Sequence, residues 1–498
     1  MKPHVVMALL LTTLLGAHAG LMHSSQPRSE NFQALVNFVQ QAGGLVADVL
    51  ADGVDADTGV RGLFVTGPMI KGEPLLVLPP GCYIEADDHD RDNASEASDG
   101  MDLKVFERLI LKLLAEQQKL SVSPLKPYLA TLPLSVPLLR DWSAKDLRLL
   151  QSESLEARAA SQREHCERTF SKLESRLVDW YPYQDDRRRA FDWAESIVRS
   201  RALDVSDRQS GVRRMLLLPV FDLCNHRSRR SGSVGGAARM EAGVEAGVEA
   251  GVEAGVEAGV EASGEEDTPP SLVVTDDGGV VMLAGRDLAA GDEVTIEYQT
   301  EGGNANLLLE YGFAEHLSSN QPGTEVLHVS TRHLPAALTT VAPTACTEQL
   351  SLGSDALDVS AVAKLRSLLS AGVEGDPSSE LLCTSLLACV QGTLNYFPSA
   401  LSSDRDELAR LQRGETDDPS GCLRVALHYR IAQKRQLTRT ATALRELLPS
   451  LTATQRATSS ICSNSGEAGH EAGIRSTAPA ESRTGAGDVL AALRTARS

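Results

Sequence analysis

The chain has 498 residues, of which 42% are hydrophobic, so it can bury a sizeable core and we expect two or three domains. The formal net charge is −19, and part of it is local, since residues 241–267 hold nine acidic residues and no basic one. Because a general nucleic-acid binder needs a basic surface to neutralise phosphates, this composition argues against a nucleic-acid partner.

The first residues look like a secretory leader. Lys2 is followed by an apolar run over 5–16 and by Ala-His-Ala at 17–19, after which a signal peptidase could cut. We expect a leader over 1–19 and a transit-like or linker piece over 20–30, which favours a plastid or the secretory pathway. A fortuitous leader would leave the protein in the cytoplasm. No apolar run is long enough to span a bilayer, so we expect no membrane association once the leader is removed.

The eight cysteines are scattered along the chain. They form neither a C-x-x-C pair nor a His/Cys set with zinc spacing, so the sequence predicts no metal site. In a chain with a core of this size they are interpreted as ordinary thiols.

Helix and strand patterns begin after residue 30. Apolar residues recur at helical spacing over 31–41, and Gly43-Gly44 ends this helix. The runs Leu63–Val65 and Leu75–Leu78 predict two strands, separated by a turn at Gly67-Pro68. Taken by itself, this part of the sequence predicts an ordinary hairpin.

A mostly helical block is predicted over about 103–203. Leu103–Leu120 carries an apolar stripe, and helical patterns resume over 144–179 and 185–203. The acidic, serine-rich residues 86–101 before the block predict a solvated loop.

Residues 216–226 read LLLPVFDLCNH. The three leucines predict a buried strand or a buried turn of helix, which Pro219 interrupts. Asp222, Asn225 and His226 then follow on a short apolar segment, where burying polar groups costs free energy unless each has a partner. Alone, this pattern is also typical of an Asn-His turn after a core element.

A repeat follows this segment. Glu241–Val260 is EAGV five times over. Each glycine costs about 1 kcal/mol relative to alanine in a helix, and the low apolar content cannot offset the ordering entropy, so we predict a disordered acidic loop over about 228–270. Ser271–Leu283 then predicts a hairpin around Asp277-Gly278.

A second informative stretch, 291–313, reads GDEVTIEYQTEGGNANLLLEYGF. The alternation from Val294 to Tyr298 predicts a strand, which Gly302-Gly303 ends. An apolar run then leads to Tyr311 and Phe313.

The ordered pair of these stretches resembles the two C-terminal motifs of SET-domain protein methyltransferases. D-x-x-N-H at 222–226 is followed by a strand ending in Glu-Tyr at 297–298, and then by Asn-Ala and Tyr-Gly-Phe. The resemblance implies an α+β protein, with a β-rich SET fold that carries a helical insert and is followed by an all-α C-terminal domain.

The helical block narrows the resemblance to the class of the Rubisco large-subunit methyltransferase. WAESIVRSRAL at 193–203 is similar to a helix of that class. The resemblance implies a SET domain over 31–315 and a helical substrate-binding domain over 316–451, where Leu and Ala recur at helical spacing. Residues 452–485 are rich in Ser, Thr, Gly and Ala, and we predict a disordered tail over 452–498 with a transient helix at 489–493.

S-adenosyl-L-methionine is the methyl donor that this resemblance implies. The implied cofactor-binding residues are Gly59, Val60, Arg61, Gly62, Arg201, Asp222, Leu223, Cys224, Asn225 and His226. A glycine has no Cβ to block close approach of a cofactor, although relatives often carry an acidic residue where Gly59 stands. Arg201 is equally well explained as a cation that interacts with the dipole of a helix C-terminus. No partner ligands for a zinc ion accompany His226.

Tyr298 is the catalytic residue that the resemblance implies, and Tyr311 and Phe313 are expected to line a methyl-acceptor channel. A lysine has an ordinary pKa near 10.4, so presenting a neutral amine at pH 7 costs roughly 4–5 kcal/mol, part of which a poorly solvated channel can supply. The tyrosine would orient the amine lone pair. Alternatively, Tyr298 is an aromatic residue at a strand end with a satisfied hydroxyl.

The expected function is therefore S-adenosylmethionine-dependent protein-lysine N-methyltransferase activity on a non-histone protein substrate. Two alternatives remain: a protein-histidine N-methyltransferase of the actin-histidine type, and a catalytically silent SET-fold binding protein. The sequence does not determine the oligomeric state or which lysine is methylated.

Overall fold

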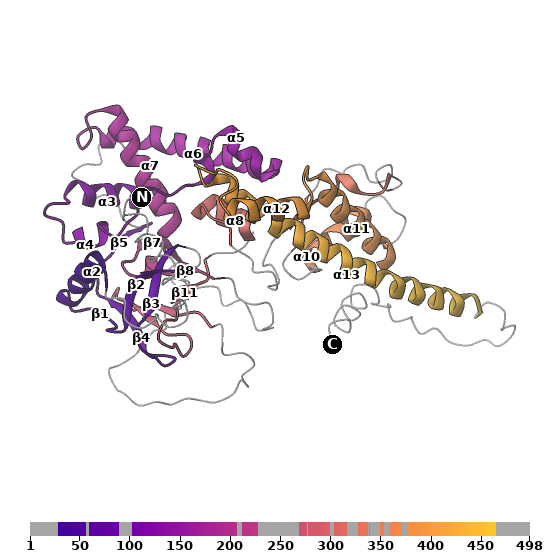
Figure 1. The fold of residues 1–498 in the computed structure, drawn as a ribbon, viewed down its shortest axis with the longest axis horizontal. Coiled ribbons are helices and arrows are strands. Elements are labelled where there is room, and N and C mark those ends of the chain that lie inside the picture. Colours follow the sequence, from indigo (N-terminus) through magenta and orange to yellow (C-terminus); the bar gives the residue numbers. More distant parts are fainter. Residues whose placement is uncertain are drawn as a thin grey trace, which may run out of the picture. The chain divides into compact units, whose positions relative to one another are not determined.

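The computed structural model describes residues 28–55, 59–88, 102–206, 212–227, 268–275, 277–298, 303–315, 327–336, 338, 349–352, 359–370 and 376–464 (Figure 1). The chain forms two compact units: a first unit of 1–138 with 160–299, and a second unit of 139–159 with 300–498. The predicted leader, EAGV repeat and segment 489–493 lie outside the described residues.

The first unit combines short strands with helices. Its elements are α2 (Glu30–Gln41), β1 (Leu45–Val46), β2 (Leu50–Val54), β3 (Arg61–Val65), β4 (Pro74–Leu78), β5 (Ile84–Asp87), α3 (Val105–Gln118), α4 (Lys126–Leu129), α7 (Gln184–Arg201), β6 (Leu203–Ser206), β7 (Arg213–Leu217), the 3-10 turn η3 (Phe221–Leu223), β8 (Asn225–His226), β9 (Ser271–Val274), β10 (Val280–Leu283) and β11 (Thr295–Ile296). Helix α6 (Glu153–Leu177) begins in the second unit and ends in the first.

Helix α2 shows why the predicted helices form. The Ser29 hydroxyl caps it by accepting a hydrogen bond from the Phe32 N–H at 3.2 Å, which satisfies one of the free donors of the first turn. The apolar positions predicted from the spacing are the ones that it buries. The helix over 31–41 is therefore confirmed.

The strands form several small sheets. One has the order β1-β4-β10-β9, another is the pair β2-β3, and a third has the order β5-β7-β6. The hairpin of β9 and β10 around Asp277-Gly278 is confirmed. The ordinary hairpin between 63–65 and 75–78 is wrong, because β3 pairs with β2 while β4 lies between β1 and β10.

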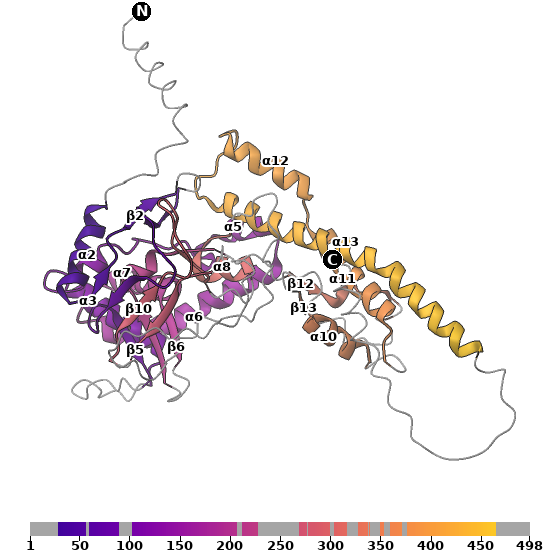
Figure 2. The same cartoon turned by 90° about the horizontal axis from the view of Figure 1, so that it is seen from below.

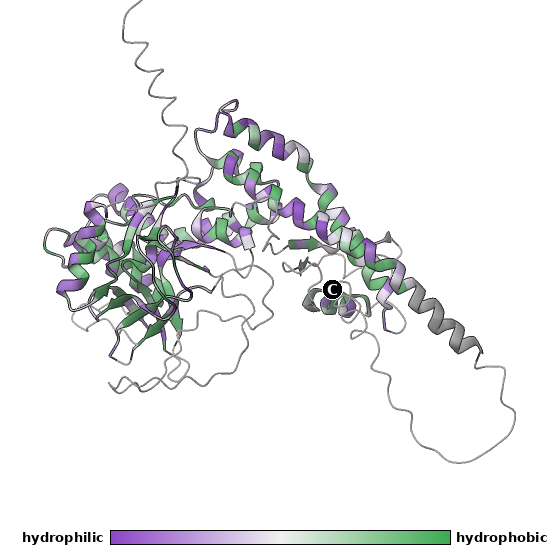
Figure 3. Cartoon of the chain, turned by 60° about the horizontal axis from the view of Figure 1, so that its bottom comes forward, coloured by the Kyte–Doolittle hydropathy of each residue, from purple (hydrophilic) through white to green (hydrophobic). Residues whose placement is uncertain are grey.

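A single apolar core joins these sheets to the helices of the first unit. Figure 3 shows that the strands of this unit are mainly hydrophobic. The leucine run of 216–218 is buried. Leu216 and Leu217 end β7 and Leu218 follows it, so the strand interpretation is the right one. Six cysteines in the described part of the chain are free thiols, and all six are buried.

The second unit is mostly helical. Its elements are the 3-10 turn η1 (Leu139–Asp141), α5 (Ala144–Leu147), η2 (Arg148–Leu150), α8 (Gly303–Tyr311), β12 (Leu327–Ser330), η5 (Thr331–His333), β13 (Gln349–Leu352), α10 (Val359–Ser370), α11 (Ser379–Tyr396), α12 (Leu401–Gln412) and α13 (Cys422–Asn464). Helices α11 and α12 pack along α13 (Figure 2).

Three features of the second unit differ from the sequence-based expectation. The antiparallel pair β12-β13 adds a small sheet to a region predicted to be all α. The helix predicted over 144–179 is broken at Gln151, which has a left-handed backbone with φ of 53°. Helix α13 continues to Asn464, where an unstructured tail was predicted from residue 452. No helix in the described part of the chain has the length and apolar character needed to cross a membrane.

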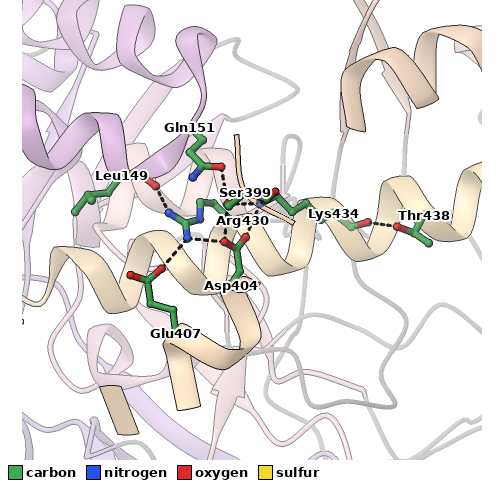
Figure 4. Close-up of polar contacts among 8 residues, drawn as sticks. All are labelled: Leu149, Gln151, Ser399, Asp404, Glu407, Arg430, Lys434 and Thr438. Atoms are coloured by element: carbon green, nitrogen blue, oxygen red, sulfur yellow. Dashed lines mark hydrogen bonds and ion pairs between the residues drawn. The ribbon is translucent and has the colours of Figure 1, made fainter. Parts of the chain in front are cut away.

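A buried cluster of charged residues holds the second unit together (Figure 4). One oxygen of Asp404 accepts hydrogen bonds from Arg430 at 2.6 Å and from the Ser399 hydroxyl at 2.7 Å, and the other accepts one from Lys434 at 2.5 Å. Arg430 also donates to the Leu149 carbonyl oxygen at 3.0 Å. This Asp404 cluster therefore attaches segment 139–159 to α12 and α13.

Candidate active site

The D-x-x-N-H segment, residues 222–226, follows a tight turn and ends in a short strand. Val220 has φ of 68° and is fully buried, and the Phe221 N–H donates to the Pro219 carbonyl oxygen at 2.8 Å across it. A β-branched residue in this conformation costs about 1–3 kcal/mol and persists only where the surrounding structure imposes it. The turn leads through η3 to Asn225 and His226, which form β8.

Strand β8 pairs in parallel with β11. Asn225 lies opposite Thr295 and His226 lies opposite Ile296. This pairing brings the two sequence motifs together.

His226 and Tyr298 are joined by a hydrogen bond. The Tyr298 backbone N–H donates to Nδ1 of His226 at 3.0 Å, and the two rings lie 5.2 Å apart. Nδ1 is therefore an acceptor, and a neutral imidazole carries its proton on Nε2. The Tyr298 hydroxyl donates to the Cys224 carbonyl oxygen at 2.9 Å, so segment 224–226 holds the tyrosine at both its backbone and its hydroxyl.

The Asn225 side chain uses both of its N–H donors inside the protein. Nδ2 donates to the Arg61 carbonyl oxygen at 3.1 Å and to Oε1 of Glu293 at 2.7 Å. Oδ1 accepts no hydrogen bond from the residues that the structure describes. The amide thus presents a hydrogen-bond acceptor.

Arg201 and Asp222 form a second, more deeply buried group. Arg201 donates to the Asp222 backbone carbonyl oxygen at 2.6 Å, and its guanidinium lies 3.4 Å from Oδ2, which also accepts from the Tyr128 hydroxyl at 3.2 Å. Burial raises the pKa of Asp222, although Arg201 and the bond from Tyr128 oppose the rise. Among the described atoms, Oδ1 of Asp222 and Nε of Arg201 are buried without a hydrogen-bond partner.

The four residues predicted around Gly59 take different places. Gly59 has φ of +70°, and a Cβ there would meet nothing within 4 Å, so this glycine serves the backbone turn rather than a close approach. Val60 is half exposed. Arg61 forms an ion pair with Asp52 at 3.0 Å and supplies its carbonyl oxygen to Asn225. Gly62 packs closely against Glu293 and Asn225.

The side chains of Leu223 and Cys224 face the core, and burial raises the pKa of the Cys224 thiol far above its ordinary value. Only backbone groups of these two residues can contact a ligand. In the part of the chain that the structure describes, no group of three or more His, Cys, Asp or Glu side chains could hold a metal ion.

Tyr311 and Phe313 belong to the second unit, and their rings lie 6.3 Å apart. Helix α8, which ends at Tyr311, packs into an apolar cluster with η1, α5 and the start of α13. A role for these two aromatic residues in an acceptor channel stays a prediction.

Sequence reasoning missed two residues that the geometry brings into the site. Glu293 lies within the stretch 291–313, directly before the alternating strand, and no local pattern marks it as a partner of Asn225. Tyr128 is fully buried, with its hydroxyl on Asp222, and nothing local in the sequence marks it.

A small, partly open pocket lies beside β11. It is lined by Arg227, 268–270, Gly285, Arg286, Leu288 and 293–297. Glu293 therefore borders this pocket with some of its atoms and contacts Asn225 with its carboxylate.

One curated relative is similar to the chain in sequence. The chloroplastic ribulose-1,5 bisphosphate carboxylase/oxygenase large subunit N-methyltransferase of Nicotiana tabacum is 25% identical over 276 residues, which are 54% of this chain and 48% of the relative. The match therefore spans about half the length of that protein. No protein-family model matches the chain.

Solved structures share the fold. The SET domain of LSMT bound to methyllysine and AdoHcy has a TM-score of 0.55 at 22% identity, covering 85% of this chain and 94% of that one. Rubisco LSMT bound to AdoMet has a TM-score of 0.55 at 21% identity, covering 93% and 100%. The predicted fold, a SET fold with a helical insert and a helical C-terminal region, is confirmed.

Proposed function

We propose that this chain is a protein N-methyltransferase that uses S-adenosylmethionine and that its acceptor is a lysine of a non-histone protein. The observation that carries the proposal is the double attachment of Tyr298 to segment 224–226, through its hydroxyl on Cys224 and its N–H on His226. Such a constrained phenol at the junction of the two motifs suits a residue that must orient a reactant. The fold and the named relative support the same reaction class.

The residues of the first unit fit such a cofactor. S-adenosylmethionine supplies a methyl group on a sulfonium and carries an ammonium group, which is a hydrogen-bond donor. The acceptor oxygen of Asn225 is suited to that ammonium, and the backbone groups of 224–226 and of Arg61 and Gly62 would hold other parts. The cofactor-binding roles of Arg201 and Asp222 belong to this proposal too, with Asp222 acting through Arg201 because its side chain is almost fully buried.

Tyr298 acts on the acceptor amine in this proposal. Its hydroxyl proton is directed at the Cys224 carbonyl oxygen, so the phenol oxygen can accept a hydrogen bond from an incoming N–H group. That bond would orient the lone pair of a neutral amine toward the methyl group. The cost of neutralising the lysine, roughly 4–5 kcal/mol at pH 7, is met in part by desolvation.

The proposal also includes a compartment and a candidate substrate, both taken from the named relative. The Nicotiana tabacum protein is described as chloroplastic and as acting on the large subunit of ribulose-1,5 bisphosphate carboxylase/oxygenase. We therefore propose a plastid location and include that large subunit among the substrates to be tried.

The test uses the full chain and a Tyr298→Phe variant. Binding of S-adenosylmethionine is measured by calorimetry, and transfer of a labelled methyl group is measured with a plastid-soluble extract and with the purified large subunit. We expect both proteins to bind the cofactor and only the parent to transfer label efficiently, with the variant slowed by about 10²–10⁴-fold. Acid hydrolysis of the labelled product distinguishes methyllysine from methylhistidine.

Two results would contradict the proposal. Failure of the parent chain to bind S-adenosylmethionine would show that the proposed cofactor site is wrong. Binding without transfer to any protein offered would favour the silent SET-fold module.

A further inference from the structure

Both the backbone and the carboxylate of Glu293 are held in place beside the Asn225 amide. Its backbone forms a β-bridge with Phe64, and the next residue, Val294, donates its N–H to the Leu63 carbonyl oxygen at 2.7 Å. Its Oε1 accepts from Nδ2 of Asn225 at 2.7 Å. The carboxylate is therefore placed by strand β3 rather than by a free loop.

Gly62 on β3 leaves the space that this contact needs. A Cβ at Gly62 would lie 2.4 Å from Oε1 of Glu293 and 2.7 Å from Nδ2 of Asn225, distances at which one of them must move. The absence of a side chain at residue 62 therefore permits the carboxylate and the amide to meet above the strand.

The identity of the acceptor decides which way the amide faces. A side-chain amide has a donor end and an acceptor end of nearly equal shape, so rotating it by 180° reverses its polarity toward a ligand. Glu293 as a carboxylate can only accept, and hydrogen bonds to a charged acceptor are about twice as strong as neutral ones. The Arg61 carbonyl oxygen favours the same orientation on the second N–H.

We propose that Glu293 is a positioning residue that locks the Asn225 amide with its oxygen toward the cofactor, and that Gly62 is required because it makes room for this lock. The inference deepens the proposed function and rests on it. It predicts that Glu293 contributes to cofactor affinity only through Asn225.

Charged groups around Glu293 are consistent with this role. Burial raises the pKa of its carboxyl, while the bond from Asn225 and the positive charge of Arg227 oppose the rise and Asp55 adds to it. The adjacent Asp292 points elsewhere, since it forms an ion pair with Arg286 at 2.8 Å. Asp292 therefore provides a matched control.

The experiment is a double-mutant cycle in the full chain. The Kd of S-adenosylhomocysteine is measured by calorimetry for the parent, for Glu293→Ala, for Asn225→Ala and for the double variant. We expect Glu293→Ala to weaken binding about tenfold or more, because the amide loses its charged partner. In the Asn225→Ala background the same change should add less than about twofold.

Two further variants exclude a merely structural effect. Glu293→Gln keeps an acceptor oxygen but not the charge and should recover part of the affinity that Glu293→Ala loses, and Asp292→Ala should leave affinity unchanged. The inference would be overturned if the fold-changes in Kd of the two single variants multiply in the double variant, or if Glu293→Ala leaves the Kd unchanged.

Urea unfolding of the same four proteins distinguishes a failure of this inference from a failure of the proposed function. If the parent binds no cofactor, the proposed function fails. Non-additive changes in unfolding midpoint would still show that Glu293 holds the amide, whereas additive changes would reject the lock as well.

Discussion

Each of the two units buries an aspartate side chain beside an arginine, but the two carboxylates differ in how many of their oxygens have hydrogen-bond partners. Asp404 in the second unit is fully buried, and both of its oxygens accept hydrogen bonds from cations or a hydroxyl. Burial alone would raise the pKa of Asp404, but the bonds from Lys434, Ser399 and Arg430 lower it below its ordinary value. The Asp222 side chain in the first unit is also almost fully buried, yet Oδ1 has no partner among the described atoms and the pKa of its carboxyl is raised.

The difference teaches how burial of the same residue type serves two purposes. A buried charge whose partners are complete holds chain segments in place, as the Asp404 cluster does for segment 139–159. A buried carboxylate with an incomplete set of partners is costly, and such sites are enriched where a protein binds or reacts. Asp222 adjoins the residues to which we assign cofactor binding, and Asp404 lies in the other unit.

Asp404→Ala should have the largest effect. Removing the carboxylate leaves the buried Lys434 without an ion-pair partner and Arg430 with only the longer ion pair to Glu407, so we expect a loss of about 3–5 kcal/mol in the free energy of unfolding. Urea titration of the full chain measures it. Glu407→Ala is the control, because this partly exposed carboxylate also contacts Arg430 but should cost less than about 1 kcal/mol. Equal losses of unfolding free energy in Asp404→Ala and Glu407→Ala would contradict the stabilising role assigned to the buried Asp404 carboxylate.

Asp222→Asn should cost less than Asp404→Asn. An asparagine at residue 404 must turn its side-chain N–H₂ toward a cation or a hydroxyl, because both oxygens of Asp404 accept from such donors. An asparagine at residue 222 can instead place its N–H₂ where Oδ1 of Asp222 lies, since that oxygen has no partner among the described atoms. We expect a loss of about 1–2 kcal/mol for Asp222→Asn, and a larger one for Asp404→Asn, in the same urea titration. A larger loss at residue 222 would show that Asp222 is the better-satisfied carboxylate.

The pH dependence of stability should differ in sign between the two aspartates. The pKa of Asp404 is depressed, so its stabilisation is present above the unfolded-state value near 3.8 and is lost as the pH falls through the lower folded value. The pKa of Asp222 is raised, so its contribution is most favourable in acid and declines as the pH rises from about 3.8 through the folded value.

Urea titrations between pH 3 and pH 7 measure this difference. Relative to the parent chain, Asp404→Asn should lose less stability on acidification, and Asp222→Asn should lose more. Parallel curves for the two variants would contradict the assignment.

Tyr128→Phe should have the smallest effect. It removes one neutral hydroxyl from Asp222, which costs about 1 kcal/mol of unfolding free energy and raises the pKa of Asp222 further, since the bond from Tyr128 lowers it. Thermal unfolding detects the change. An unchanged melting temperature would mean that the hydroxyl contributes nothing to holding the carboxylate.

The sequence supported the active site better than it supported the sheets. Asn225, His226 and Tyr298 were predicted to act together because two motifs in fixed order resemble a known family, and the pairing of β8 with β11 brings them together. The strands over 63–65 and 75–78 were recognised, but their partners lie far away in the chain, which local patterns do not report.

The contacts that position the site were the least predictable. Glu293 contacts Asn225 across 68 positions of the sequence, and Tyr128 contacts Asp222 across 94. Neither residue has a local pattern that distinguishes it from an outward-facing polar residue or a core aromatic. Gly59 and Gly62 looked alike in the sequence, although one serves a backbone turn and the other a close contact.

Segment 139–159 has a consequence for how the protein is made. Its apolar residues pack against residues near the start of α13, such as Cys422 and Tyr429, so their partners leave the ribosome almost three hundred residues later. At roughly 5–20 residues per second, the nascent chain carries this segment without its α13 partners for about 15–60 s, and among the described residues α8 is the only buried part of the cluster made in between. Until α13 is made, the apolar cluster that holds Leu139, Trp142 and Leu147 is incomplete, and a chaperone that binds it would protect the emerging chain from aggregation.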